Sequence, residues 1–180
     1  NVGKSTLVNR LCRKRVAIVA DEPGMTRDRV YAQTTLRGRP AVLVDTGGFD
    51  IDPDSPIVEA IRDQLFVAVQ EADVILCLFD GATSPTALDE EVVDHLRRTA
   101  RPVIWAANKT EGKKSRQVAL EYHELGIEDL MMVSAAQGDG IGELLDAVVA
   151  VMPRQTEKEP SFVAPEGAVR LAIMGRPNAG

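Results

Sequence analysis

The sequence predicts an α/β fold with a doubly wound, mostly parallel sheet, and three features lead to this prediction. Short apolar runs typical of buried strands alternate with stretches whose apolar residues recur at helical spacing. Two of these runs end directly in polar residues, at the edge where such sheets bind ligands. The first six residues, Asn-Val-Gly-Lys-Ser-Thr, match the second half of the phosphate-binding pattern G-x-x-x-x-G-K-[ST].

The helical spacing and the short apolar runs predict the helices and strands along the chain. Helical patterns cover residues 4–12, 57–72, 86–99, 115–125 and 140–152. Strand patterns cover residues 30–36, 41–44, 73–80, 102–107, 131–133 and 168–174. A loop is expected over residues 16–29, a turn over 37–40, and a polar, proline-containing linker over 153–167.

Composition limits the classes of function. The net charge of -6 and the pI near 5.0 give no sign of nucleic-acid binding by the whole chain. Cys12 and Cys77 lie in apolar contexts and are expected to be buried free thiols, which fits a reducing cytoplasm. No apolar run approaches the ~20 residues of a membrane-spanning helix, so no membrane partner is expected.

The Gly-Lys-Ser stretch predicts a phosphate site. Successive backbone N–H groups, unhindered at glycine, can surround a phosphate at the N-terminus of the next helix. Lys4 would bind the β- and γ-phosphates, and the Ser5 hydroxyl would coordinate Mg²⁺. The alternative is an ordinary helix start with Ser5 or Thr6 near the cap.

Two further segments follow predicted strands. Asp45-Thr46-Gly47-Gly48 fits D-x-x-G, in which the Asp holds the Mg²⁺ water shell and the Gly amide contacts the γ-phosphate. Asn108-Lys109-Thr110-Glu111 is close to N-K-x-D, whose carboxylate accepts hydrogen bonds from guanine and thereby favours GTP over ATP. Alone, each segment could equally be a polar turn that ends a strand.

A third segment, Ser134-Ala135-Ala136, comes after the next predicted strand. At this place in the order, a Ser-Ala pair can turn its backbone amides toward the guanine carbonyl. The tripeptide has no meaning by itself.

The end of the chain repeats the motif of its beginning. Gly175-Arg176-Pro177-Asn178-Ala179-Gly180 supplies G-x-x-x-x-G and stops where Lys-Ser should follow, with Gly175, Asn178 and Gly180 as its expected phosphate-site residues. We therefore expect a piece of a longer protein with two copies of one nucleotide-binding unit. Residues 1–152 would form the first G domain, 153–167 the linker, and 168–180 the start of the second.

In this order, the motifs resemble the TRAFAC class of GTPases. Together with Pro-Gly-Met-Thr-Arg-Asp-Arg, Asp-Thr-Gly-Gly-Phe and the second Gly-Arg-Pro-Asn-Ala-Gly, the chain resembles the bacterial double-GTPase family of ribosome assembly, Der or EngA. The resemblance implies a P-loop NTPase G domain that binds GTP or GDP and hydrolyses GTP. It also implies binding to the large ribosomal subunit and its rRNA through regions outside this chain.

The resemblance also assigns roles to residues. Lys4, Thr26 and Gly48 would be catalytic; Ser5, Thr26 and Asp45 would hold Mg²⁺, and Asn1 is a candidate ligand for K⁺. The nucleotide would be bound by these residues: Asn1, Val2, Gly3, Lys4, Ser5, Thr6, Asp45, Thr46, Gly47, Gly48, Phe49, Asn108, Lys109, Thr110, Glu111, Ser134, Ala135, Ala136, Gly175, Asn178 and Gly180. Glu111 departs from the usual Asp by one methylene, and guanine preference is expected to persist.

The G-domain fold predicts one unusual strand position. Its first strand lies at the centre of the sheet, and this chain begins after it. Because an empty slot would leave two ladders of backbone groups unpaired, residues 169–174 are expected to dock there in parallel, between the strands at 41–45 and 73–80. This docking would bring Gly175 and Asn178 near Lys4.

Alternative functions remain open at this point. Phe49 stands where Ras-like enzymes place a water-orienting Gln, so hydrolysis is expected to be slow and to need K⁺ or a partner. A non-hydrolysing GTP-binding module that regulates its second copy is the main alternative. An ATP-binding P-loop protein is disfavoured by Asn108-Lys109, and a single-domain GTPase of the Era or tRNA-modification type by the second phosphate loop.

Overall fold

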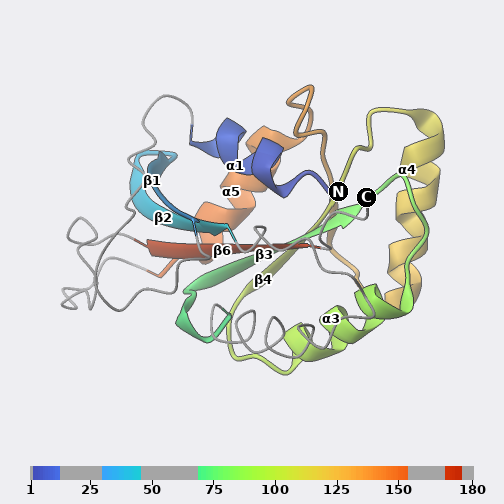
Figure 1. The fold of residues 1–180 in the computed structure, drawn as a ribbon, viewed down its shortest axis with the longest axis horizontal. Helices are drawn as coiled ribbons and strands as arrows, with labels where there is room; N and C mark the ends of the chain where they lie inside the picture. Colours follow the sequence, from blue (N-terminus) through green and yellow to red (C-terminus); the bar gives the residue numbers. More distant parts are fainter. Residues whose placement is uncertain (1, 13–29, 46–68, 154–168, 176–180) are drawn as a thin grey trace.

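A computed structural model describes residues 2–12, 30–45, 69–153 and 169–175. These residues form a six-stranded sheet with helices on both sides (Figure 1). The strands are β1 (Val30–Leu36), β2 (Arg39–Asp45), β3 (Val74–Asp80), β4 (Val103–Asn108), β5 (Leu130–Met132) and β6 (Val169–Gly175). Their order across the sheet is β1-β2-β6-β3-β4-β5.

The sheet is mostly parallel, as the alternation of helical and strand patterns predicts. Among the described residues, neighbouring strands pair in parallel except β1 with β2, which are antiparallel. A two-residue turn of Arg37 and Gly38, both at positive φ, joins these two strands. Parallel strands end at one edge, so β2, β3, β4 and β6 bring their carboxyl ends together there.

The last described strand, β6, lies at the centre of the sheet. It pairs in parallel with β2, where Leu43 faces Leu171, and in parallel with β3, where Leu76 faces Ile173. The predicted docking of residues 169–174 between the strands at 41–45 and 73–80 is therefore confirmed. The apolar Val-Arg-Leu-Ala-Ile-Met run suits this position, because a central strand of a parallel sheet is buried on both faces.

Helices cover the two faces of the sheet. The helices α1 (Lys4–Leu11) and α5 (Ile141–Val151) pack on one face, and α3 (Ala87–Arg97) and the 3₁₀ helix η1 (Leu120–Leu125) pack on the other (Figure 1). Strand β3 supplies both cores, because its successive side chains point to opposite faces. One core receives Val74, Leu76 and Leu78, and the other Ile75, Cys77 and Phe79.

Most described elements agree with the sequence prediction to within one or two residues at each end, and two of the differences have a clear physical reason. The helix expected over residues 115–125 consists of α4 (Lys113–Ala119) followed by η1, and the tighter 3₁₀ turns end at Gly126 in the left-handed region. Within η1, Tyr122 is fully buried against Phe79, with the ring centroids 4.6 Å apart. The strand expected at 41–44 begins two residues earlier, because Arg39 and Pro40 pair with Leu36 and Thr35 of β1 across the two-residue turn.

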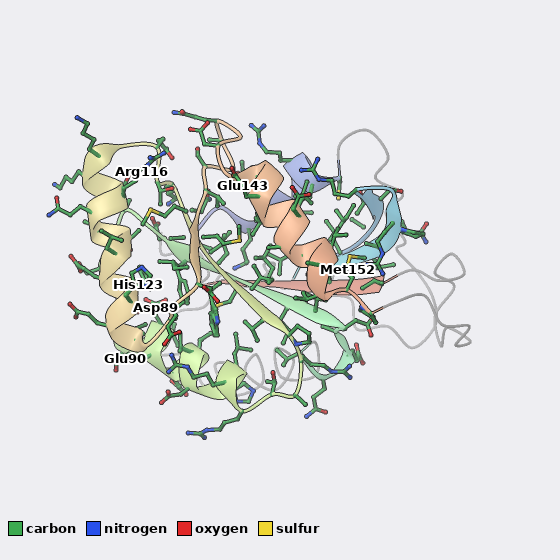
Figure 2. All side chains as sticks on the ribbon, turned by 180° about the vertical axis from the view of Figure 1, so that it is seen from behind. Asp89, Glu90, Arg116, His123, Glu143 and Met152 are labelled. Carbon is green, nitrogen blue, oxygen red and sulfur yellow. The ribbon has the colours of Figure 1, made fainter. Side chains whose placement is uncertain are left out.

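Figure 2 shows the same fold from behind, with Glu143 and Met152 at the two ends of α5 and Arg116 on α4. Both cysteines are buried free thiols, as predicted. Within the described ranges, no helix has the length and apolarity needed to cross a membrane.

Candidate nucleotide-binding site

The start of α1 has the backbone that a phosphate loop requires. Gly3 precedes the helix with φ 88°, a left-handed conformation that favours glycine, and its carbonyl accepts the first helical hydrogen bond from Leu7 at 3.0 Å. The next residue, Lys4, is buried, whereas Ser5 and Thr6 are exposed on the first turn. The helix N-terminus and two hydroxyl groups are therefore accessible to a ligand.

The Asn108 side chain joins this helix start to the rest of the site. Its Nδ2 donates to the carbonyl of Val2 at 2.7 Å, and its Oδ1 accepts from the backbone amide of Ala135 at 2.8 Å. Asn108 is almost fully buried at the end of β4, so both bonds lie away from solvent. One side chain thus connects three segments that the sequence predicted separately.

The contact between Gly3 and Asn108 leaves no room for a larger residue. A Cβ atom added at Gly3 would overlap the Asn108 amide nitrogen. Glycine is therefore required at this position for two reasons: the positive φ and the close approach of Asn108. The predicted phosphate loop and the predicted base-binding segment are in direct contact.

Lys109 follows Asn108 and adopts an unusual backbone. Its φ is 65°, which is uncommon for a residue with a side chain and is found most often where a surrounding structure imposes it. Its ammonium group donates to Asp80 Oδ2 at 2.6 Å. Asp80 is nearly buried at the end of β3, while the Lys109 side chain is about one-third exposed. The ion pair holds a partly exposed cation at the carboxyl edge of the sheet.

The next two residues, Thr110 and Glu111, differ in their exposure to solvent. Thr110 is buried, and its hydroxyl donates to the Val133 carbonyl at 3.0 Å, which anchors the segment to the strand end after β5. Glu111 is exposed, so its carboxylate is available to a ligand. Arg116 of α4 donates to the Thr110 carbonyl at 2.9 Å and supports the segment from outside.

The Ser134-Ala135-Ala136 segment forms a closed turn beside Asn108. Ser134 and Ala135 are buried, and Ala136 is exposed. The sequence predicts that backbone amides of the Ser-Ala pair face a guanine carbonyl; one of them, the Ala135 amide, donates to Asn108 in this structure. Gln137 donates its amide to the Ser134 hydroxyl at 3.1 Å, which shapes the turn.

Several predicted site residues are described only in part or not at all. Asp45 ends β2, and its backbone pairs with Ile173 of β6, while Gly175 ends β6 beside Leu78. Both strand ends therefore lie at the same edge of the sheet as Asn108. Outside the described residues lie Asn1, Thr26, Thr46, Gly47, Gly48, Phe49, Asn178 and Gly180.

Two residues of the site were missed by the sequence prediction. Asp80 could have been found, because it is a carboxylate that ends an apolar strand next to the strand of Asn108. Arg10 could not, since its guanidinium donates to the Ala135 and Ala136 carbonyls, which lie 125 and 126 residues away in sequence. Only the packing of α1 brings these groups together.

The pKa of Cys77 responds to charges on both sides of the sheet. Burial raises the pKa of the Cys77 thiol on β3, Asp89 raises it further, and the Lys4 ammonium opposes this shift. In the described part of the chain, no group of three or more His, Cys, Asp or Glu side chains could hold a metal ion.

The fold and this edge of the sheet define a P-loop GTPase domain. The model of the family described as "50S ribosome-binding GTPase" matches residues 1–109, and the chain belongs to this family. All of the chain aligns with a protein named GTPase Der from Symbiobacterium thermophilum at 51% identity, which confirms the resemblance to that family. The chain spans about two fifths of the length of the curated relatives it matches.

Solved structures agree on the fold. The structure of a tyrosine-to-alanine variant of Aquifex aeolicus Era bound to GDP·AlF₄⁻ superposes with a TM-score of 0.68 at 27% identity, covering 90% of this chain and 56% of that chain. A structure of Era with MgGDPNP and nucleotides 1506–1542 of 16S ribosomal RNA gives the same TM-score at 25% identity, covering 91% and 57%. The predicted P-loop G-domain fold is confirmed.

Proposed function

We propose that this chain is a GTP-binding domain that hydrolyses GTP to GDP and phosphate. The observation that supports it best is that the Asn108 side chain donates a hydrogen bond to the Val2 carbonyl and accepts one from the Ala135 amide. These bonds unite a helix N-terminus suited to phosphates with two segments suited to guanine. An isolated helix start or an isolated turn would not need this connection.

The phosphate end of the site would depend on Lys4. Its ammonium would stabilise the charge that develops on the γ-phosphoryl group, and the amides at the start of α1 would bind the phosphates. Ser5, Thr26 and Asp45 are the proposed Mg²⁺ ligands, and their hydroxyl and carboxylate oxygens suit this ion. When bound, Mg²⁺ supplies positive charge to the phosphate oxygens.

The base end would depend on Asn108, Lys109 and Glu111. The exposed Glu111 carboxylate would accept hydrogen bonds from the guanine imino and amino groups, which adenine lacks on that edge. Thr110 holds this segment in place through its bonds to Val133. Ser134, Ala135 and Ala136 would complete the pocket around the guanine carbonyl.

The reaction would be in-line attack of water on the γ-phosphorus, with the Gly48 amide contacting the γ-phosphate. Phe49 cannot orient water, so intrinsic hydrolysis would be slow. A K⁺ ion bound by Asn1, or a partner protein, would supply the missing charge. Equal turnover in K⁺ and in Na⁺ would contradict the role of the ion.

We further propose that the whole protein acts in assembly of the large ribosomal subunit and binds rRNA through regions outside this chain. Residues 1–152 would form one G domain, 153–167 a linker and 168–180 the beginning of a second. The family description, which names the 50S ribosome, supports the large subunit, and the Era complex with 16S rRNA supports only rRNA binding in general. Relatives more than twice as long as this chain support the further regions. A cytoplasmic location fits the two free thiols.

The decisive test compares GTP with ATP on the full-length gene product, by equilibrium binding and by single-turnover hydrolysis. We expect binding of GTP and GDP, little binding of ATP, and slow release of phosphate. Glu111→Asp should retain the preference for guanine, because the carboxylate remains. Equal affinity for GTP and ATP would contradict the proposal.

A non-hydrolysing GTP-binding module is the second candidate, and Phe49 favours it. Such a module would bind GTP with the same selectivity and regulate a second G domain. Single-turnover GTP hydrolysis distinguishes the regulatory module from the enzyme. It is measured for the first G domain in a full-length protein whose second phosphate loop has been inactivated by mutation. Bound GTP that remains intact would support the regulatory module.

A further inference from the structure

Arg10 connects the phosphate-binding helix to the loop proposed to surround guanine. It lies in the last turn of α1, the helix that begins at Lys4. Its Nε donates to the Ala135 carbonyl at 2.5 Å, and one of its terminal nitrogens donates to the Ala136 carbonyl at 2.5 Å. Two adjacent carbonyls are thus bound by one planar cation, and such charge-assisted bonds are stronger than neutral ones.

The loop is shaped to receive this guanidinium. Gly138 has φ 99°, and its amide donates to the Ser134 carbonyl at 2.7 Å, which closes the turn. A Cβ atom at Gly138 would lie 2.8 Å from an Arg10 terminal nitrogen. The bare glycine backbone therefore leaves the space that the guanidinium occupies.

The two sides of the loop have separate partners. On one side, the Ala135 amide faces Asn108. On the other side, the Ala135 and Ala136 carbonyls face Arg10. Because a carbonyl and the amide of the following residue share one planar peptide, fixing the Ala135 and Ala136 carbonyls on α1 also fixes the directions of the Ala136 and Gln137 amides, while Asn108 holds the Ala135 amide.

We propose that Arg10 is a positioning residue for guanine specificity: it holds the Ser134–Ala136 loop on α1, so that the phosphate end and the base end of the site keep one fixed separation. This inference rests on the proposed function, since it assumes that the loop binds guanine. Arg10 itself touches no phosphate or base in this scheme and acts through the loop.

The matched control is Arg39. Its guanidinium also donates to two backbone carbonyls, those of Val149 at 3.1 Å and Pro153 at 2.5 Å, at the far end of α5. Arg39→Ala therefore removes the same kind of bonds from a place that the nucleotide does not reach. A merely structural role of Arg10 would give the same result as this control.

The test measures the affinities of GDP and ADP for the full-length protein by competition with labelled GDP. Arg10→Ala should weaken GDP binding about tenfold, the effect of one lost charge-assisted hydrogen bond, and leave ADP binding nearly unchanged. Arg10→Lys should have a smaller effect, because an ammonium cannot bind both carbonyls as a fork. If Arg10→Ala does not fold, the Arg10→Lys comparison decides.

Hydrogen exchange of the nucleotide-free protein gives a second, independent readout. Amides of residues 134–139 should exchange faster in Arg10→Ala than in Arg39→Ala. If the ratio of GDP affinity to ADP affinity were the same in Arg10→Ala as in Arg39→Ala, the inference would be overturned. Wild-type protein that binds no GDP would instead refute the proposed function, and the exchange result alone would then decide whether Arg10 holds the loop.

Discussion

The contact between Gly3 and Asn108 makes a single glycine decisive for the site. Gly3→Ala places a methyl group against the Asn108 amide and adds strain at φ 88°. Because Asn108 can relieve the overlap only by moving away from Val2 or Ala135, we expect nucleotide affinity to fall at least about tenfold. Isothermal titration with GDP measures the effect.

Gly38→Ala separates the overlap from the backbone strain. Gly38 has nearly the same φ, 85°, but nothing lies within 4 Å of an added Cβ. This variant should lose about 1 kcal/mol of stability from the strained backbone and keep its GDP affinity. Equal loss of GDP affinity in both variants would contradict the role of the Gly3–Asn108 contact.

The ion pair of Lys109 with Asp80 offers a second prediction at the same scale. In Asp80→Asn, the Ala82 amide keeps an oxygen acceptor, but the Lys109 ammonium loses its charged partner. We expect GDP affinity to fall about five- to tenfold, because Lys109 no longer has one fixed position. Thermal unfolding should change little.

Asp146→Asn is the control for that variant. Asp146 pairs with Arg37 at 2.8 Å, but both side chains are about half exposed or more, and the pair joins the β1–β2 turn to α5. Exposed ion pairs contribute little to stability, so neither unfolding nor GDP affinity should change. A loss of affinity with Asp146→Asn would show that the Asp80 effect is not specific to the site.

At the scale of elements, β6 stabilises the sheet from its centre. Leu171 is 1% exposed and lies in register with Leu43 on one side and Val74 on the other. Leu171→Ala would leave a cavity between strands that are fixed on both sides, and we expect a loss of about 2–5 kcal/mol. Chemical denaturation followed by circular dichroism measures it.

Leu120→Ala is the control for Leu171→Ala, because it makes the same change of side chain at an exposed position. Leu120 begins η1 and is half exposed, so its truncation should change stability by no more than about 0.5 kcal/mol. If the two variants were equally stable, β6 would not be part of the core. Because both variants remove the same atoms, the difference in their stability reports on the buried position of β6 and not on the size of the side chain.

At the scale of the molecule, sequence pattern predicted the sheet well because most of its strands contain a compact apolar run between polar segments. The position of β6 followed from the resemblance to the G domain, whose first strand is central, together with the need of the two neighbouring strands for partners to their backbone groups. Asn108 and Gly3 were predicted from their motifs, and the structure brings them together. Long-range polar contacts, such as that of Arg10 with Ala135, could not be predicted, because they depend on packing between residues with no common sequence pattern.

Cys77 can report on the whole fold, because it lies at the centre of the sheet. It is 1% exposed, its core also contains Ala172 of β6, and burial raises the pKa of its thiol, so that the reactive thiolate is scarce in the folded chain. Deleting residues 169–180 in a Cys12→Ser background should therefore speed its reaction with Ellman's reagent by about a hundredfold or more.

Deleting only residues 176–180 is the control, since it leaves all of β6 in the sheet. Without β6, the facing edges of β2 and β3 lose their partners and the side chains of both cores become accessible to water. The thiol pKa should then fall back toward its ordinary value, which increases the thiolate fraction at a given pH near 8. Slow, equal reaction of Cys77 in both truncated chains would show that the other five strands close on themselves, and that the central strand is not needed to exclude water from the sheet.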